Sequence, residues 1–274
     1  MPRPDPEDIA VTLLLEGLYQ RHGQDFRDYA RASIRRRITH FMRMRNYTSI
    51  AAMIEPLLAD DDFCRMLVHD LTVNVSEMFR DASFYHSLRR NIMPRLQDIP
   101  HARVWLAGCA SGEEAYSMAI LFTEAGMAGR VRIYATDLNE QVLHQARTGI
   151  FPLNRLRRFT LAYQQGGGVE SFADYYTADD SSAVFHHRLR EMIVFAAHNL
   201  VTDAVFGEMH MVICRNVLIY FNRALRDRVL TVLRDSLLPG GYLCLGSKEN
   251  LAFTEVADHF EEVDGDNRIY RKVV

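Results

Sequence analysis

Apolar side chains recur every three or four residues in the first part of the chain, which is the period of a buried helix face. The longest such run predicts a helix from Asp25 to Arg45. Its apolar positions are Phe26, Ala30, Ile34, Ile38 and Phe41. An earlier helix is expected to have Asp5 as its N-cap, ahead of a proline, and to end near Gly23.

Two further helices follow with the same period. One is predicted to start near Thr48, and the other to span about Asp61 to Leu71. Glycine and proline are sparse in this part of the chain, and no alternating strand pattern occurs. We therefore predict a small all-α domain over residues 1–80.

After Pro94 the pattern changes to short apolar runs separated by helical segments. Each run is predicted to be a buried strand: Val104–Ala107, Val131–Thr136, Met192–Ala197, Met209–Cys214 and Gly241–Leu245. Strands that alternate with helices are typical of a parallel sheet covered on both faces. The second domain, residues 81–274, is therefore predicted to be α/β, with a doubly wound, mostly parallel, Rossmann-like sheet. Leu237–Gly241 is expected to be a turn before the last strand.

The alternation lapses between Gly149 and Arg190. A glycine-rich turn at 164–168 and a polar loop at 178–182 precede a short apolar run that begins at Val184. This pattern predicts a small β-subdomain, inserted at about residues 175–191.

Composition adds few constraints. The chain has 274 residues and a formal net charge of −3, which gives no general attraction to nucleic acid. The apolar runs are too short to span a bilayer, and the N-terminus is polar, so we expect a cytoplasmic protein without membrane insertion. Four scattered cysteines without a C-x-x-C pair predict buried thiols and no metal site.

The turn after the strand Val104–Ala107 is the strongest chemical signal. Gly108 and Gly112 bracket it, and Glu113 and Glu114 open the next helix. Two carboxylates at a helix N-terminus suit the helix dipole but repel a pyrophosphate. The pattern therefore favours a cationic ligand such as S-adenosylmethionine over a dinucleotide. The alternative is a structural turn with two solvated glutamates.

Three more strand ends carry candidate ligand groups. Asp137 lies 25 residues beyond Gly112, close to the spacing of about 20 residues expected of an acid that binds a ribose diol; its alternative role is a helix N-cap. Asn199 could read the edge of an adenine, or could be an ordinary turn residue. Arg215 and Asn216 follow the strand that ends at Cys214, at the expected ligand crevice.

Two further features remain ambiguous from the residues themselves. Tyr220 follows Asn216 in an apolar run, where a tyrosine more often packs in the core than takes part in catalysis. Leu71–Asp81 mixes polar and β-branched residues, which is a poor pattern for either a helix or a strand. This mismatch indicates residues selected for contacts, although an irregular linker would show the same pattern.

Five segments in this order closely resemble the CheR family of chemotaxis receptor glutamate O-methyltransferases. They are Asn74–Arg80, Ala110–Ser117, Ala135–Leu143, Cys214–Tyr220 and Leu238–Gly241. The resemblance covers nearly the whole chain and implies a class I methyltransferase fold. It implies a set of S-adenosylmethionine-binding residues: Asn74, Ser76, Arg80, Glu113, Asp137, Asn199, Leu200, Arg215 and Asn216. It also implies that Arg80 and Tyr220 lie near the transferred methyl group.

Three positions depart from the family pattern. Ser76 replaces a common threonine but keeps the hydroxyl, and Ser247-Lys248 stands before Glu249 where a His-Ser or Ser-Ser pair is more usual. The loop Ala178–Ala183 contains no glycine, which argues against tethering to a receptor's C-terminal pentapeptide.

The implied reaction transfers a methyl group from S-adenosylmethionine to receptor glutamates, giving methyl esters and S-adenosylhomocysteine. A glutamate is already ionised at neutral pH, so no general base is needed. The expected partner is the cytoplasmic domain of a methyl-accepting receptor, with the protein acting as a monomer. The candidate docking surface is a basic helix face formed by Arg27, Arg31, Arg35, Arg36 and Arg37, for which a solvated basic face is the alternative.

Two other functions use a similar sheet. One is a cofactor-binding regulatory module without turnover, against which the presence of Arg80 and Tyr220 argues. The other is a nicotinamide-dependent oxidoreductase, against which the missing G-x-G-x-x-G and the adjacent glutamates argue.

Overall fold

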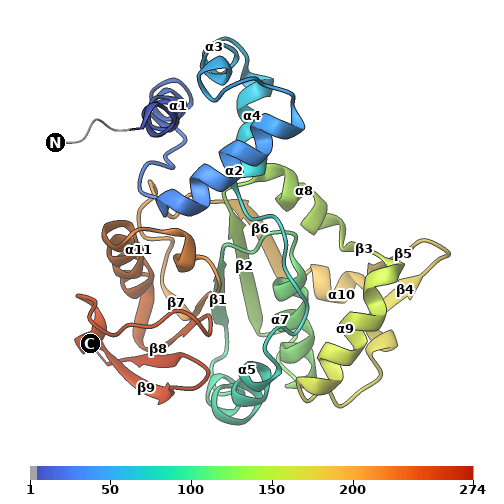
Figure 1. The fold of residues 1–274 in the computed structure, drawn as a ribbon. Helices are drawn as coiled ribbons and strands as arrows, with labels where there is room; N and C mark the ends of the chain where they lie inside the picture. The colour runs from blue at the N-terminus through green and yellow to red at the C-terminus, as the bar shows by residue number, and fades with distance from the viewer. Residues whose placement is uncertain (1–4, 274) are drawn as a thin grey trace. The chain divides into compact units, whose positions relative to one another are not determined.

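The computed structural model describes residues 5–273, which divide into two compact units. One unit consists of the described chain up to Val73 together with Ile219–Arg228. The other consists of Asn74–Leu218 and the chain from Val229 onward. Helix α11 (Arg223–Asp235) begins in the first unit and ends in the second. Figure 1 shows the elements of both units.

The first unit is helical. Its elements are α1 (Pro6–His22), α2 (Arg31–Met44), the 3₁₀ turn η1 (Ala51–Met53), α3 (Ile54–Ala59) and α4 (Asp61–Leu71). The predicted caps of α1 are confirmed: Asp5 accepts a hydrogen bond from the Glu7 backbone N–H at 3.2 Å, and Gly23 ends the helix at a φ of 70°. Helix α4 has the predicted limits.

The predicted start of α2 is wrong by six residues, because α2 begins at Arg31 rather than Asp25. The Asp25 carboxylate accepts from the backbone N–H of Arg27, a local turn that competes with helix formation. Phe26 keeps the helical spacing because it is fully buried, and its ring packs against that of Tyr29 at 4.8 Å. The helical spacing of apolar residues therefore extends beyond α2 on its N-terminal side, to Phe26.

The second unit contains a seven-stranded sheet in the order β6-β2-β1-β7-β8-β10-β9. The strands are β1 (Ala102–Ala107), β2 (Val131–Asp137), β6 (Ile193–Ala197), β7 (Met209–Cys214), β8 (Leu237–Leu245), β9 (Phe260–Asp264) and β10 (Ile269–Lys272). The first five of these are parallel to one another, and β10 is antiparallel to both β8 and β9. The predicted α/β class and mostly parallel sheet are confirmed.

The predicted turn at Leu237–Gly241 lies inside β8 instead. Leu237 pairs with Met209, and the ladder resumes where Tyr242 pairs with Met211. Four residues of β8, at positions 238–241, lie opposite the single residue His210 of β7 and have no regular partner in the ladder. They include Pro239, which a strand accepts at such an irregularity because no ladder donor is needed there.

The second unit also contains helices: α5 (Ala82–Ser87), the π-helix η2 (Leu88–Ile92), α6 (Met93–Leu96), α7 (Glu113–Glu124), α8 (Glu140–Thr148), α9 (Leu153–Gln165) and α10 (His187–Arg190). Three further 3₁₀ turns are η3 (Phe172–Tyr175), η4 (Leu218–Tyr220) and η5 (Ala257–His259). A separate antiparallel sheet has the order β3-β5-β4, from Ile150–Pro152, Ser182–Phe185 and Tyr176–Ala178. This is a small β-subdomain of the kind expected; β3 joins it from before residue 175.

Candidate active site

The turn between β1 and α7 requires both of its glycines. Gly108 and Gly112 have φ angles of 84° and 91°, which only glycine adopts without strain. A Cβ on Gly108 would lie 2.5 Å from Val217, and one on Gly112 would lie 2.8 Å from the Cβ of Ala146. The glycines therefore allow close packing against the protein itself, in addition to the sharp turn.

Glu113 is fully buried at the first position of α7, so the alternative of two solvated glutamates is wrong for this residue. Its Oε2 accepts from the Ser111 hydroxyl at 2.6 Å. Its Oε1 accepts from the Arg155 guanidinium at 2.6 Å. Arg155 comes from α9 and also donates to the backbone carbonyl of Ser76 at 2.9 Å.

Asp137 ends β2 and faces the turn. Its Oδ2 accepts from the Ala110 backbone N–H at 2.8 Å, and its Oδ1 accepts from that of Asn139 at 3.0 Å. Burial raises the pKa of Asp137, although these backbone hydrogen bonds oppose the rise. The N-cap alternative is wrong, because Asn139 caps α8 by accepting from the Gln141 N–H.

The segment from Asn74 to Asp81 is irregular but tightly held. The Asn74 side chain accepts from Asn139 at 2.9 Å, and the Phe79 N–H donates to the Ser117 hydroxyl of α7 at 3.0 Å. Phe79 and Asp81 both have positive φ angles, of 50° and 61°. Arg80 between them is exposed, so its side chain faces outward while its neighbours are fixed.

Arg215 is buried at the end of β7, and both terminal nitrogens of its guanidinium bind the protein, whereas its Nε has no hydrogen-bond partner among the residues described. Its guanidinium pairs with Glu114 at 2.7 Å and with Asp81 at 2.6 Å, and it lies 4.0 Å from the centre of the Phe84 ring. It also donates to the Arg80 carbonyl at 3.3 Å. The next residue, Asn216, has a φ of 61° and donates its backbone N–H to Glu249 at 3.0 Å. These bonds tie β7, α7 and the 74–81 segment together.

Asn199 and Leu200 follow β6. The Oδ1 of Asn199 accepts from the Val201 N–H at 2.9 Å, as in an ordinary asparagine turn. Its side-chain amide nitrogen has no hydrogen-bond partner among the residues described, and the side chain is half-buried. The turn role and a ligand role for this amide are therefore compatible. Leu200 is buried.

Tyr220 belongs to the first unit, whereas Arg80 belongs to the second. The Tyr220 carbonyl accepts from the Ala30 N–H at 2.7 Å, and the guanidinium of Arg37 lies 5.5 Å from the centre of its ring. Tyr220 is half-buried, which fits either packing or contact with a ligand.

Sequence reasoning missed Arg155 and the cap Asn139. Arg155 lies 42 residues beyond Glu113, in the region where the strand and helix alternation lapses, so no spacing rule pointed to it. The cap could have been found, because Asn139 directly precedes the helix that begins at Glu140.

The expected basic stripe is largely paired within its own unit. Arg27 lies before α2 and binds Asp25 and Glu16, Arg31 donates to the Asp8 carbonyl, and Arg35 binds Glu7 and Asp8. These arginines bind groups in α1, in the following loop or in both, while Arg27 and Arg35 stay partly exposed and Arg31 is exposed. Arg37 donates to the Thr72 carbonyl.

A different face of α2 remains open. Arg36, His40 and Arg43 are exposed, and with Ala32, Arg35 and Thr39 they line a hollow of about 470 Å³. No ion pair occurs at Arg36 or Arg43 among the residues described.

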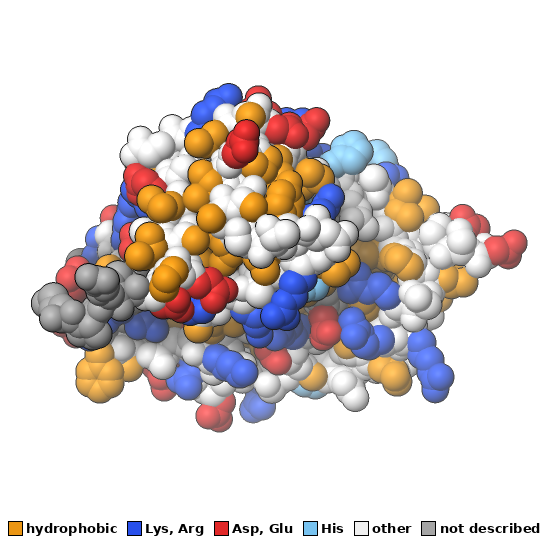
Figure 2. Space-filling view, turned by 45° about the horizontal axis from the view of Figure 1, so that its top comes forward, with side chains coloured by type: hydrophobic (Ala, Val, Ile, Leu, Met, Phe, Trp, Pro, Cys, Tyr) orange, Lys and Arg blue, Asp and Glu red, His pale blue; other side chains and the backbone are white. Residues whose placement is uncertain are grey.

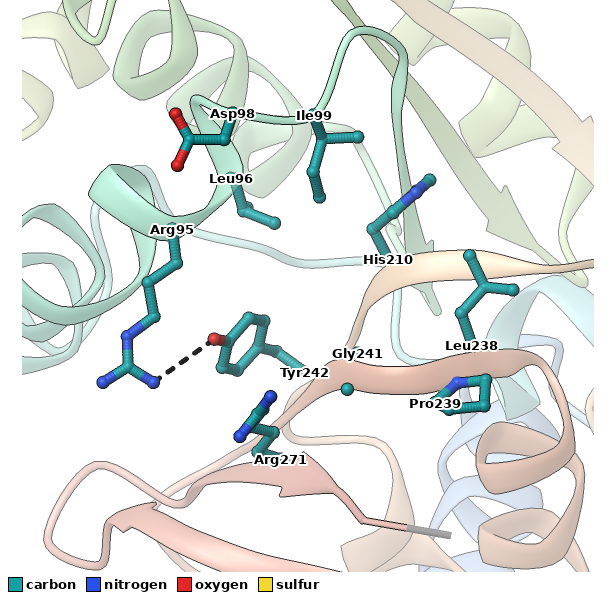
Figure 3. A pocket seen from close by; sticks show the side chains of 11 residues that line it. Arg95, Leu96, Asp98, Ile99, His210, Leu238, Pro239, Gly241, Tyr242 and Arg271 are labelled. Carbon is teal, nitrogen blue, oxygen red and sulfur yellow. Dashed lines mark hydrogen bonds between the residues drawn. The ribbon is translucent and has the colours of Figure 1, made fainter.

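A larger cavity, of about 660 Å³, lies away from the predicted site (Figure 3). His210, which lines it, stands at the start of β7, whereas Arg215 and Asn216 follow the end of that strand. Arg95 reaches the Tyr242 hydroxyl at 3.5 Å on one side of the cavity. Within residues 5–273 no cluster of His, Cys, Asp and Glu could hold a metal ion, and no helix is long and apolar enough to span a membrane.

Two family models match the chain. The CheR methyltransferase all-alpha domain matches residues 10–72, and the CheR methyltransferase SAM-binding domain matches residues 74–269. A putative methyltransferase, Cher3, from Pseudomonas putida is 44% identical over 265 residues, which are 97% of each chain.

Two chemotaxis protein methyltransferases show the same likeness at lower identity. That of Pseudomonas aeruginosa (methyltransferase 1) is 30% identical over 83% of this chain and 84% of its own. That of Salmonella typhimurium is 30% identical over 86% of this chain and 81% of its own. The chain therefore belongs to the CheR methyltransferase family and is an S-adenosylmethionine-dependent methyltransferase.

Proposed function

We propose that this enzyme methylates glutamate side chains in the cytoplasmic domain of chemotaxis receptors. The observation that carries the proposal is the Asp137 carboxylate, which ends β2 beside the Gly108–Gly112 turn in an S-adenosylmethionine-dependent family. The names of the relatives from Pseudomonas aeruginosa and Salmonella typhimurium support a role in chemotaxis.

The groups around the turn fit the cofactor. Asp137 keeps free lone pairs for ribose hydroxyls after it accepts the backbone N–H groups of Ala110, Leu138 and Asn139. The amide nitrogen of Asn199, which has no partner among the residues described, suits an adenine edge, and the buried Glu113 suits an ammonium group. The remaining assignments rest on the resemblance: Asn74, Ser76, Leu200, Arg215 and Asn216 around the cofactor, with Arg80 and Tyr220 near the methyl group.

Three buried groups near the turn cannot serve as a general base. Burial raises the pKa of the Cys109 and Cys214 thiols and of the Tyr85 phenol, so all three stay protonated at neutral pH. A protonated group cannot remove a proton from an alcohol, thiol or ammonium acceptor. A glutamate needs no such step, because its reference pKa is about 4.3.

The cofactor supplies an electrophilic methyl group on a sulfonium. The glutamate oxygen forms a bond to this carbon while the carbon–sulfur bond breaks, and the electron pair stays on sulfur. The products are a methyl ester and S-adenosylhomocysteine, and no proton is exchanged. The protein's contribution is to align the two reactants, an effect worth up to about 7 to 11 kcal/mol.

We assign receptor docking to the outward face of α2, formed by Arg36, His40 and Arg43, in place of the paired arginines. An exposed basic face whose Arg36 and Arg43 form no ion pair within residues 5–273 complements an acidic receptor helix. Figure 2 shows hydrophobic side chains gathered on the helical unit, where α1 and α3 leave Ile9, Leu13 and Leu58 exposed. Apolar and basic surfaces on one unit suit docking of a helical partner.

The test is methyl transfer from isotope-labelled S-adenosylmethionine to purified receptor cytoplasmic domains. Base-labile label, lost when the receptor's methylatable glutamates are changed to glutamine, is the expected result. Label that resists base, or that persists in the glutamine variants, would assign a different acceptor.

A further inference from the structure

The two oxygens of the buried Glu113 carboxylate both have partners within the protein. Ser111 donates to Oε2, and Arg155 donates to Oε1. The Glu113 side chain is 0% exposed, whereas that of Arg155 is 29% exposed. The arginine therefore joins a fully buried charge to the open side of the site.

Arg155 is held by three elements at once. It is carried by α9, it pairs with the start of α7 through Glu113, and it donates to the Ser76 carbonyl in the 74–81 segment. Its guanidinium also lies 5.0 Å from the centre of the Phe159 ring, one turn along the same helix. The planar group is therefore oriented before any ligand arrives.

The methionine end of S-adenosylmethionine carries an ammonium and a carboxylate. If Glu113 receives the ammonium, as the proposed function requires, the cation competes with Arg155 for the same carboxylate. A guanidinium released from a carboxylate beside an amino-acid zwitterion has one matching partner, the ligand's own carboxylate, which it can bind in bidentate form.

We propose that Arg155, which pairs with Glu113, recognises the carboxylate of S-adenosylmethionine. The inference rests on the proposed placement of Glu113 in the cofactor site. Arg155 acts as a specificity residue that reads the amino-acid end of the ligand, and it takes no part in breaking the carbon–sulfur bond.

The test compares S-adenosylmethionine with its decarboxylated analogue by calorimetry, using the full-length enzyme and Arg155→Met. In the parent enzyme the analogue should bind about tenfold or more weakly. Arg155→Met should weaken the binding of S-adenosylmethionine by a similar factor. The affinity for the analogue should stay equal or rise, because the ammonium no longer competes with Arg155 for Glu113.

The matched control is Arg158→Met. Arg158 lies on the same helix, is 60% exposed and pairs with Glu77 of the same segment at 3.2 Å. It should leave both affinities unchanged. The inference would be overturned if Arg155→Met lowered the affinity for both ligands equally, or if the preference for the carboxylate stayed unchanged.

The binding result is independent of the methyl acceptor. If the preference depends on Arg155 but no receptor glutamate is methylated, the proposed acceptor fails and the role of Arg155 stands. If receptor glutamates are methylated but Arg155→Met keeps the preference for the carboxylate, the proposed acceptor stands and the role of Arg155 fails.

Discussion

The carboxylate of Asp137 is subject to two opposing electrostatic effects. Burial raises its pKa, while backbone N–H groups of Ala110, Leu138 and Asn139 lower it, and burial dominates. The turn after β1 thus holds the Asp137 side chain in place. Because its pKa is raised, the carboxylate is protonated more readily than that of an ordinary aspartate.

We expect S-adenosylmethionine affinity to fall on acidification at a pH above about 3.9, the reference pKa of aspartate. The ionised carboxylate is the stronger acceptor for ribose hydroxyls, so binding weakens as the pH falls through the raised pKa. Calorimetry over a pH series should show this loss in the parent and a flatter profile in Asp137→Asn. Asp137→Ala should cost about 1 to 3 kcal/mol of binding at neutral pH. Unchanged affinity in both variants would remove Asp137 from the site.

Arg215 shows how a residue implied by family resemblance can have a structural role. Its pairs with Glu114 and Asp81 leave little of the guanidinium free, and its side chain is 3% exposed. Arg215→Met should therefore lower the free energy of unfolding, by about 3 kcal/mol, because Glu114 is left largely buried without a partner. Urea unfolding measures this change.

Arg223→Met is the matched control, since Arg223 is 76% exposed and its pair with Asp227 spans 3.9 Å. Its unfolding curve should match that of the parent. Should Arg215→Met instead keep full stability and lose cofactor affinity, Arg215 would be a ligand contact and not a structural tie.

At the scale of elements, helix caps and buried strands were predictable because their causes are local. Asp5, Gly23 and the five apolar runs determine their own positions. The start of α2 was not predictable from local causes, since Phe26 is buried by tertiary packing at a position that matches the helical spacing. Strands β9 and β10 were also missed. The sequence of β9, Phe-Glu-Glu-Val-Asp, lacks a buried apolar face.

The α2 face predicts a specific charge dependence. Arg36→Glu with Arg43→Glu should raise the KM for receptor and leave cofactor affinity unchanged, because both side chains are exposed and have no ion-pair partner among the residues described. Methylation by the parent should weaken with salt, since exposed charges are screened beyond about 8 to 10 Å. The double variant should show a smaller salt dependence.

The control carries the same change of charge elsewhere in the helical unit. Arg21→Glu with Arg65→Glu alters two exposed residues that pair with Asp61 and Asp62. It should leave the receptor KM near that of the parent. Equal effects of both pairs would indicate a general charge effect instead of docking on α2.

At the scale of the whole molecule, the sequence was informative about the sheet and much less about the site's internal bonds. Asp137 and Arg215 were placed correctly at the ends of parallel strands, because strand ends meet at one edge. The pairing of Glu113 with Arg155, and of Arg215 with Glu114, joins residues 42 and 101 positions apart. No periodicity encodes such contacts, so only the folded chain reveals them.

Under the proposed function, two surfaces are candidates for receptor capture: the helical unit and the small sheet. In the loop between β4 and β5, Asp179 accepts from the backbone N–H groups of Ser181 and Ser182 at 2.8 and 2.7 Å. These hydrogen bonds lower the pKa of Asp179, so the carboxylate stays ionised and keeps the donors occupied at neutral pH. A peptide carboxylate would find no free donor at these positions.

We therefore expect removal of a receptor's last five residues to change its KM by less than about twofold, well under the tenfold that corresponds to 1.4 kcal/mol. Steady-state methylation of full-length and truncated receptor, with the parent and with Arg36→Glu/Arg43→Glu, measures both capture sites in one experiment. The truncation should leave the defect of the double variant intact, because the two changes act on separate surfaces. If truncation abolishes methylation while the charge reversal has no effect, substrate capture belongs to the small sheet and α2 is an ordinary solvated helix.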